Sequence, residues 1–404
     1  MTPEEETPLP FALPDVTDRE IEAVQEVLRS RWLTTGARAH EFEKRFAERV
    51  GARHAVAVNS CTAALHLALE AVGVGAGDLV YVPTYTFAAS AEVVRYLGAT
   101  PVLVDSEPDT LNLDLAHLEQ LICSDLDGAR GVPRAVIPVH FAGTPCDMRA
   151  VWDLARRHGL AVVEDAAHAF PASRAGIVTG WMPEDVDGAV CFSFYATKTL
   201  TTGEGGMVTT QSEAVAERIR MMSLHGLSRQ AWNRYTAGGT WRYDIVAPGY
   251  KYNLTDIAAA MGLVQLERAE AMRERRAVIA DRYDRSFSDL PLQLPSVPSG
   301  ASTAWHLYVV RVAGEVADER DRVIASLTEQ GIGTSVHFIP LHLHTYYRNT
   351  WGVAAEDLPV ASREFERVIS LPIYSAMSDD DVARVIRAVH RAYDGGLVGH
   401  GGQQ

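Results

Sequence analysis

Short apolar runs alternate with amphipathic segments through the first half of the chain. The apolar runs predict buried strands at His54–Val58, Leu79–Val82, Pro101–Val104, Ala135–Val139, Ala161–Glu164 and Ala189–Phe194. The segments between them predict helices at Thr62–Val72, Phe87–Leu97, Asp114–Ile122 and Met148–His158. This alternation predicts an α/β domain with a mostly parallel sheet and helices on both faces. Its ligands are expected beyond the carboxyl ends of the strands.

The pattern changes after residue 255. Thr255–Phe287 is helical in period and rich in charge, which predicts a long connecting helix. We therefore expect a large domain over 1–265, which includes an N-terminal helix opened by a capping box at Thr17 and Glu20, and a smaller α+β domain over 266–395. The Gly-rich end, 396–404, is expected to be a frayed tail. In the smaller domain we expect strands at Trp305–Val312 and Thr334–Phe338 and helices at Asp318–Gln330, Ser362–Val368 and Asp379–Tyr393.

Charge and composition narrow the function classes. The chain of 404 residues has 37 Lys and Arg against 52 Asp and Glu, a formal net charge of −15, which argues against a partner such as nucleic acid or anionic lipid. Its four cysteines form no CxxC pair, which favours reduced thiols. We see no apolar signal segment and no apolar run near the ~20 residues of a membrane span, so a cytoplasmic protein is expected.

The turn Asn59-Ser-Cys-Thr62 lies between a predicted strand and a predicted helix. Backbone amides and hydroxyls at a helix N-terminus bind phosphate, because the unpaired N–H groups and the helix dipole both favour an anion there. The alternative is an ordinary N-cap, and taken alone the turn favours that interpretation.

A carboxylate and an imidazole follow the predicted strand at 161–164. Asp165 stands at its carboxyl end and His168 comes three residues later. A carboxylate there faces the ligand crevice. A carboxylate at this position could equally cap the next helix or bind a metal, and taken alone Asp165 favours those roles over a specific cofactor contact.

Lys198 ends an otherwise uncharged, aromatic run, Cys191-Phe-Ser-Phe-Tyr-Ala-Thr-Lys198. Burial would lower the pKa of its amine, and a neutral amine attacks a carbonyl to form a Schiff base. Most lysines are merely solvated, which is the alternative. The Gly-rich loop Thr201–Gly206 follows directly and permits close backbone approach to a ligand. There is no P-loop motif, and no GxGxxG follows the first strand, which disfavours nucleotide hydrolases and dinucleotide dehydrogenases.

Together these features indicate a site for pyridoxal 5′-phosphate (PLP). The chain resembles the nucleotide-sugar aminotransferases of PLP fold type I, the DegT-like sugar aminotransferases, from about Leu9 to about Tyr393. The motifs that carry the resemblance are SRWLTTG (30–36), NSCTAALHLAL (59–69), PTYTFAAS (83–90), EDAAHA (164–169), FSFYATKTLTTGEGG (192–206), GYKYNLTDIAAA (249–260) and HFIPLH (337–342).

The resemblance implies a role for each matching residue. Lys198 would hold the cofactor aldehyde and move the 1,3-proton. The other implied cofactor contacts are Asp165 at the pyridine nitrogen, His168 near the ring hydroxyl, Phe87 stacked on the ring, Cys61, Thr62 and Ser193 at the phosphate, and Asn253 at the phosphate of the neighbouring subunit of a homodimer. Cys61 stands where the family commonly has Gly, and 170–187 departs from the family pattern, so we carry no substrate contacts through that stretch.

The resemblance also implies the reaction. L-Glutamate would give an amino group to a nucleoside-diphosphate 4-keto or 3-keto 6-deoxysugar, with a dTDP-sugar and C4 favoured, for a glycosylated natural product or a cell-surface glycan. Three rivals stay open: a dehydratase, which normally has His in place of the lysine, a non-catalytic PLP-binding regulator, and a decarboxylase or aldolase. Lys198 argues against the dehydratase.

Other polar residues carry weaker expectations. Thr34, Tyr195, Arg229 and His337 are candidate substrate contacts. His337, His342 and His344 could suggest a metal site, but no carboxylate or cysteine lies at ligand spacing, so no metal is expected. The arginines of the long helix alternate with glutamates, which favours a solvated face over nucleic-acid binding.

Overall fold

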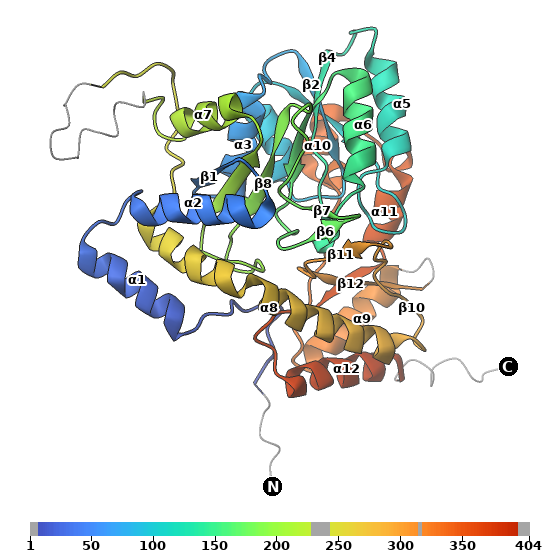
Figure 1. Ribbon diagram of the computed structural model, residues 1–404. Helices are drawn as coiled ribbons and strands as arrows, with labels where there is room; N and C mark the ends of the chain where they lie inside the picture. The colour runs from blue at the N-terminus through green and yellow to red at the C-terminus, as the bar shows by residue number, and fades with distance from the viewer. Residues whose placement is uncertain (1–6, 228–242, 314–316, 395–404) are drawn as a thin grey trace.

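The computed structural model describes residues 7–227, 243–313 and 317–394. Its centre is a seven-stranded sheet in the order β1-β9-β8-β5-β4-β2-β3, in which β9 alone runs antiparallel to its neighbours (Figure 1). The predicted α/β fold with a mostly parallel sheet is confirmed. The strands are β1 (His54–Val58), β2 (Asp78–Pro83), β3 (Thr100–Val104), β4 (Val132–Val136), β5 (Ala161–Asp165), β8 (Gly188–Ser193) and β9 (Gly206–Thr210).

Helices cover both faces of this sheet. Alternate residues of a strand point to opposite faces, so Val163 of β5 packs in the core under one set of helices and Val162 in the core under the other. On the first face lie α3 (Cys61–Ala71), α4 (Ala89–Tyr96) and α7 (Glu213–Met222). On the second lie α2 (Ala37–Val50), α5 (Leu115–Asp125) and α6 (Met148–His158), as Figure 1 shows.

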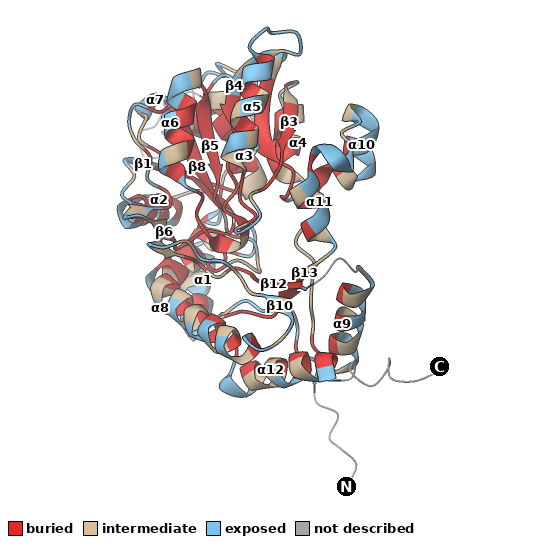
Figure 2. Cartoon of the chain, turned by 90° about the vertical axis from the view of Figure 1, so that its right-hand side faces the viewer, coloured by how far each residue is buried: buried red, intermediate tan, exposed pale blue. Residues whose placement is uncertain are grey.

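A second, smaller core lies below the large sheet. It is built on an antiparallel sheet, and the buried residues in Figure 2 form a separate inner layer there. Leu9, near the start of the chain, packs into this core, where its N–H donates to Gly331 O at 2.8 Å. The elements are β10 (Leu292–Gln293), β12 (Tyr308–Val312), β13 (Val368–Leu371), α9 (Ala317–Glu329) and α12 (Asp379–Asp394).

The helix α8 (Asp256–Phe287) contributes to both cores without a break. Leu263 and Leu266 pack with α2 against the large sheet, and Tyr283 and Phe287 pack in the smaller core. α1 (Asp18–Ser30) lies along α8, and the predicted capping box is present at its start. Division of the chain into two domains at residue 265 stays a prediction, and α8 continues through that point.

The remaining elements are short. They are β6 (Ser173–Arg174), β7 (Ile177–Val178) and β11 (Ala301–Ser302) in a third small sheet, and α10 (Thr345–Trp351), α11 (Pro359–Phe365) and the 3₁₀ turns η1 (Phe141–Gly143), η3 (Leu341–Leu343) and η4 (Ala355–Asp357). No helix among the described ranges is long and apolar enough to cross a membrane.

Several element predictions were wrong. Residues 334–338 form no strand; only Ser335 makes a bridge, to Ser370, because the chain then turns its next side chains into a cavity described below. Residues 362–368 were expected to be one helix, but α11 ends at Phe365 and β13 begins at Val368. β4 begins and ends three residues earlier than predicted. The elements α2, α7 and β9 were not predicted.

Candidate active site

A cavity of about 380 Å³ opens at the carboxyl ends of the central strands, between the two cores. Segments far apart in the sequence line it: the start of α3, the ends of β5 and β8, the segment before β12, and the segment after α9. The predicted site residues that line this cavity are Cys61, Thr62, Phe87, Asp165, His168, Ser193, Tyr195, Lys198 and His337.

Lys198 lies in the turn between β8 and β9 and points into this cavity. The chain has three lysines, and the other two, Lys44 and Lys251, are exposed whereas Lys198 is half-buried. Burial lowers the pKa of the Lys198 amine to about 8, although the nearby Cys61 and Asp165 oppose that shift. A large fraction of this amine is therefore neutral near pH 8, as a nucleophile or general base requires.

Asp165 is the last residue of β5 and is buried. Its Oδ2 accepts a hydrogen bond from Ser90 Oγ at 2.8 Å, and its Oδ1 accepts one from the Ala167 N–H at 3.1 Å. Burial raises the pKa of the carboxyl, and these two donors and the positive charge of Lys198 work against that shift. The side chain is thus oriented by donors that favour its ionised form.

Three histidines surround Lys198: His168, His306 and His337. Burial and the neighbouring lysine lower all three pKa values, that of His337 to about 4, so the imidazoles are neutral near pH 7. The His168 ring lies 4.4 Å from that of His306 and stacks on Phe338 at 5.8 Å between ring centroids. The Nδ1 atoms of His168 and His306 are buried and have no hydrogen-bond partner among the described residues.

The N-terminus of α3 forms another wall. Ser60 is its N-cap, and Ser60 Oγ accepts from the Ala63 N–H at 3.0 Å. Cys61 and Thr62, the first residues of the helix, line the cavity, and the amides of a helix's first turn have no acceptor within the helix. Burial raises the pKa of the Cys61 thiol well above its usual range, so the thiol is neutral and does not repel an anion there. A Cβ on Gly206 would lie 2.6 Å from the backbone of Ser60, so the loop approaches the helix start closely.

Aromatic side chains line the outer part of the cavity. Phe87 is 64% exposed, and its ring lies 6.4 Å from that of Phe338. Phe11, from the N-terminal segment, stacks on His337 with 5.5 Å between ring centroids. Tyr195 is also exposed at this opening. The opening is therefore apolar and accessible, in contrast to the polar floor at Asp165.

Two predicted residues among the described ranges, Asn253 and Thr34, do not line this cavity. Asn253 lies beside the end of β1, where it bridges Val58, and its Nδ2 donates to Thr35 Oγ1 at 2.7 Å. Thr34 is exposed, and its carbonyl accepts from the Asp256 N–H. Arg229 lies outside the described residues, as does the tail at 396–404.

Phe11, His306 and Phe338 are among the lining residues that were not predicted. Ser90, which donates a hydrogen bond to Asp165 without lining the cavity, was also missed. Ser90 and Phe338 belong to the motifs PTYTFAAS and HFIPLH, where a polar residue three positions after Phe87 and an aromatic residue next to His337 were usable signals. His306 stood inside a predicted strand, and no pattern separated it from core residues. Within the described ranges, no group of three or more His, Cys, Asp and Glu side chains could hold a metal ion.

The residues of this cavity fit PLP. An amine of lowered pKa suits the aldehyde, a buried carboxylate suits the pyridine nitrogen, and a helix N-terminus suits the phosphate. His168 Nδ1, which no described residue hydrogen-bonds, is a polar atom that suits a ring substituent. With the α/β sheet, they define a PLP-dependent enzyme of fold type I.

Comparison with known proteins identifies the family. Residues 14–390 match the model of the DegT/DnrJ/EryC1/StrS aminotransferase family, and the chain belongs to this family of transaminases. It is 48% identical over 386 residues to the spore coat polysaccharide biosynthesis protein SpsC of Bacillus subtilis (strain 168), covering 94% of this chain and 96% of SpsC. The predicted membership of this aminotransferase family is thereby confirmed.

Solved structures agree with this assignment. The PLP form of Spr1654 from Streptococcus pneumoniae superposes with a TM-score of 0.86 at 34% identity, covering 96% of this chain and 99% of Spr1654. Helicobacter pylori PseC, an aminotransferase involved in the biosynthesis of pseudoaminic acid, gives a TM-score of 0.86 at 26% identity, with 96% and 100% covered. The protein is thus a sugar aminotransferase.

Proposed function

We propose that the protein transfers the amino group of L-glutamate to C4 of a dTDP-4-keto-6-deoxysugar, in the synthesis of an amino sugar for a cell-surface glycan or a glycosylated natural product. The observation that carries this proposal is the convergence of Lys198, Asp165 and the N-terminus of α3 on one cavity. An amine, a carboxylate and an anion site in one place suit two successive amino transfers.

The roles of the residues follow from their surroundings. PLP, when bound, supplies a conjugated ring that withdraws electrons from the carbon next to the transferred nitrogen. Lys198 Nζ would take the proton from that carbon and return it on the other side of the nitrogen, because burial keeps a neutral amine available. Asp165 would keep the pyridine nitrogen protonated, and His168 would orient the ring hydroxyl.

The phosphate group of PLP would be bound without a cationic side chain. Backbone amides at Cys61 and Thr62, together with the Thr62 and Ser193 hydroxyls, would bind it at the start of α3. Phe87 would stack on the ring face. Lys198 is the one Lys or Arg among the described residues that line the cavity, so hydrogen bonds rather than charge would bind this anion.

We also propose a homodimer in which Asn253 reaches the phosphate of the neighbouring subunit. Within its own chain Asn253 does not line the cavity, although its side chain is held in place by Thr35 and by Lys251. A side chain that is oriented by hydrogen bonds but does not line the cavity of its own chain suits a role in a second copy.

The substrate class rests on the relatives. SpsC carries a name from spore coat polysaccharide synthesis, and PseC one from pseudoaminic acid synthesis, so a sugar substrate is supported. Thr34, Tyr195, Arg229 and His337 are proposed substrate contacts, of which Tyr195 and His337 line the cavity.

One experiment tests the substrate. The purified protein is incubated with L-glutamate and a panel of dTDP- and UDP-linked 3-keto and 4-keto sugars, and products are followed by mass spectrometry. We expect the amino sugar from a dTDP-4-keto-6-deoxysugar. Amination of only UDP-sugars or of only 3-keto sugars would contradict the finer assignment, and no amination in the whole panel would contradict the nucleotide-sugar substrate.

A further inference from the structure

The amino group of Lys198 has one hydrogen-bonding side chain within reach among the described residues, His306. Lys198 Nζ lies 3.3 Å from His306 Nε2. His306 is 7% exposed and comes from the segment between β11 and β12, more than a hundred residues from Lys198 in sequence. Among the described residues its Nδ1 has no hydrogen-bond partner, so within that part of the chain the contact with Lys198 is the one hydrogen bond of this imidazole.

The backbone on both sides of His306 is hydrogen-bonded to the 3₁₀ turn η1. The Ala304 N–H donates to Gly143 O at 3.1 Å, and the Leu307 N–H donates to Ala142 O at 3.2 Å. These two bonds flank His306 and connect it to η1. The imidazole is therefore placed by the framework that also carries the cavity floor.

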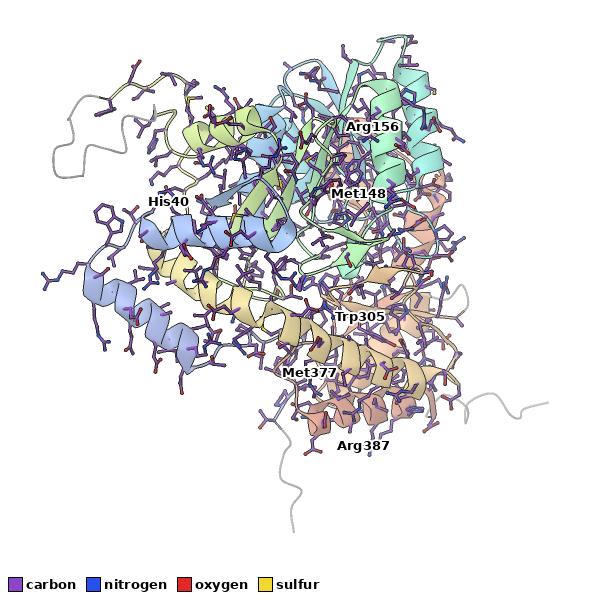
Figure 3. The ribbon with its side chains drawn as sticks, in the orientation of Figure 1. His40, Met148, Arg156, Trp305, Met377 and Arg387 are labelled. Carbon is purple, nitrogen blue, oxygen red and sulfur yellow. The ribbon has the colours of Figure 1, made fainter. Side chains whose placement is uncertain are left out.

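A buried arginine holds the same segment from the other side. Arg276 of α8 is 3% exposed, and its Nη1 donates to Trp305 O at 3.3 Å and to Ile373 O at 2.6 Å. Trp305, labelled in Figure 3 between the two cores, has φ 49°, an unusual conformation for a bulky residue. The next residue, His306, is thus directed toward Lys198 by backbone contacts on two sides.

The pKa values of His306 and Lys198 determine which of the two side chains carries a proton that they share. The pKa of His306 is well below the ordinary value because of burial and the nearby charge of Lys198, whereas the pKa of Lys198 is about 8. A proton shared between them stays on Lys198. A neutral imidazole with its proton on Nδ1 can still accept a hydrogen bond at Nε2.

We propose that His306 is a positioning residue that accepts a hydrogen bond from Lys198 after the lysine has taken the substrate proton, and so holds the charged amino group at the cavity wall between the two proton transfers. The proton stays on Lys198 Nζ, and His306 gains and loses none. This inference rests on the proposed role of Lys198 as the base.

Two substitutions separate this role from simple packing. In His306→Gln the side-chain carbonyl can take the place of Nε2, so an acceptor remains. In His306→Asn the shorter amide reaches only the Nδ1 position, so the acceptor is lost. The half-reaction with L-glutamate is followed by the absorbance of the cofactor in a single turnover. We expect His306→Asn to slow the proton transfer at least ~tenfold with little change in glutamate affinity, and His306→Gln to stay within ~threefold of the parent.

A second measurement does not depend on turnover. The full chain is freed of PLP, and acylation of Lys198 is measured against pH by mass spectrometry. Loss of the acceptor removes a contact that favours the ammonium form, so His306→Asn should lower the midpoint by about one pH unit, and His306→Gln should restore it. Lys44 and Lys251 serve as internal controls with unchanged profiles.

The outcomes distinguish a failure of the proposed role of Lys198 from a failure of the positioning role of His306. Borohydride reduction of each variant first shows which lysine binds PLP. If the label is on another lysine, the proposed function of Lys198 fails. If the label is on Lys198 but His306→Asn and His306→Gln share one acylation midpoint, the positioning role is overturned. Should His306→Asn not fold, His306→Leu supplies the variant without an acceptor, and the same comparison decides.

Discussion

Ser90 Oγ donates a hydrogen bond to Asp165 Oδ2 over 2.8 Å, and both residues are buried. The hydroxyl of Thr86 lies 2.9 Å from Ser90 Oγ and so completes a short polar chain behind the carboxylate. Together with the Ala167 N–H on Oδ1, the Ser90 contact orients the carboxylate at the cavity floor. This contact opposes the effect of burial, which raises the pKa of the carboxyl.

Ser90→Ala should weaken PLP binding. Without this donor the pKa of Asp165 rises further, and the carboxylate is less able to keep the pyridine nitrogen protonated. The loss of one hydrogen bond to a charged group contributes about 1.5–3 kcal/mol, an increase of more than ~tenfold in the dissociation constant. Titration of the protein with PLP, followed by absorbance, measures this dissociation constant. Ser124→Ala, on the exposed surface of α5, is the matched control and should bind PLP as the parent does.

Lys198 should carry the cofactor covalently. Borohydride reduction followed by peptide mapping should place the label on Lys198, because burial lowers its pKa to about 8 while Lys44 and Lys251 are exposed. With three lysines in the chain the map is unambiguous. A label on Lys44 or Lys251 would refute the site assignment.

Gly206→Ala should reduce PLP affinity without unfolding the sheet. The added Cβ would lie 2.6 Å from the Ser60 carbonyl and 2.8 Å from Cys61 N, so the start of α3 must shift. Amides that bind phosphate lose their alignment when this backbone moves. Gly75→Ala adds a Cβ with no atom within 4 Å and serves as the control. Equal PLP affinities in the two variants would show that this close approach does not shape the phosphate site.

The cofactor-free protein should gain stability from Lys198→Met at pH 7. Burial lowers the folded-state pKa of Lys198 from 10.5 to about 8. Below pH 8 the folded protein therefore holds a charged, buried amine that destabilises it, and above pH 10.5 the amine is neutral in both the folded and the unfolded state. The parent therefore becomes more stable relative to the variant as pH rises from 8 toward 10.5. The expected advantage of the variant at pH 7 is at most about 3 kcal/mol. Urea unfolding at pH 7 and 9.5 measures it, and an advantage that does not shrink between these pH values would contradict the lowered pKa.

A shared active site predicts complementation. Chains carrying an Asn253→Ala change are mixed with chains carrying Lys198→Ala, under conditions that exchange subunits. If Asn253 serves the neighbouring subunit, one of the two sites in each mixed dimer keeps both residues, and about half of the parent activity per mixed dimer should return. Confirmed mixed dimers without any recovery would rule out the contribution across the interface.

The sequence predicts the central sheet well because its strands are buried on both faces. Runs such as Ala161–Glu164 have no exposed side to break the apolar pattern. β9 was missed because it begins at Gly206, inside a loop pattern, and its strand pairing depends on distant partners in β1 and β8. Helix α2 was missed although Phe42 and Phe46 pack at helical spacing.

The candidate site was predictable where the chemistry follows from the local sequence. Asp165 ends a strand and Lys198 follows another, so both were placed at the correct edge. His306 was not predictable, because its role depends on contacts made by η1 and Arg276, which no local pattern reveals. Phe11 lies almost two hundred residues from Lys198 and reaches the cavity only through the pairing of Leu9 with Ile332.

The continuity of α8 limits how this protein could be divided. A fragment that stopped at residue 265 would remove Tyr283 and Phe287 from the smaller core, and a fragment that began there would lack Leu9, which belongs to the same core. Neither piece would retain a complete interior. Exchange of the C-terminal portion between relatives would therefore need to carry the whole of α8 and the N-terminal segment together with it.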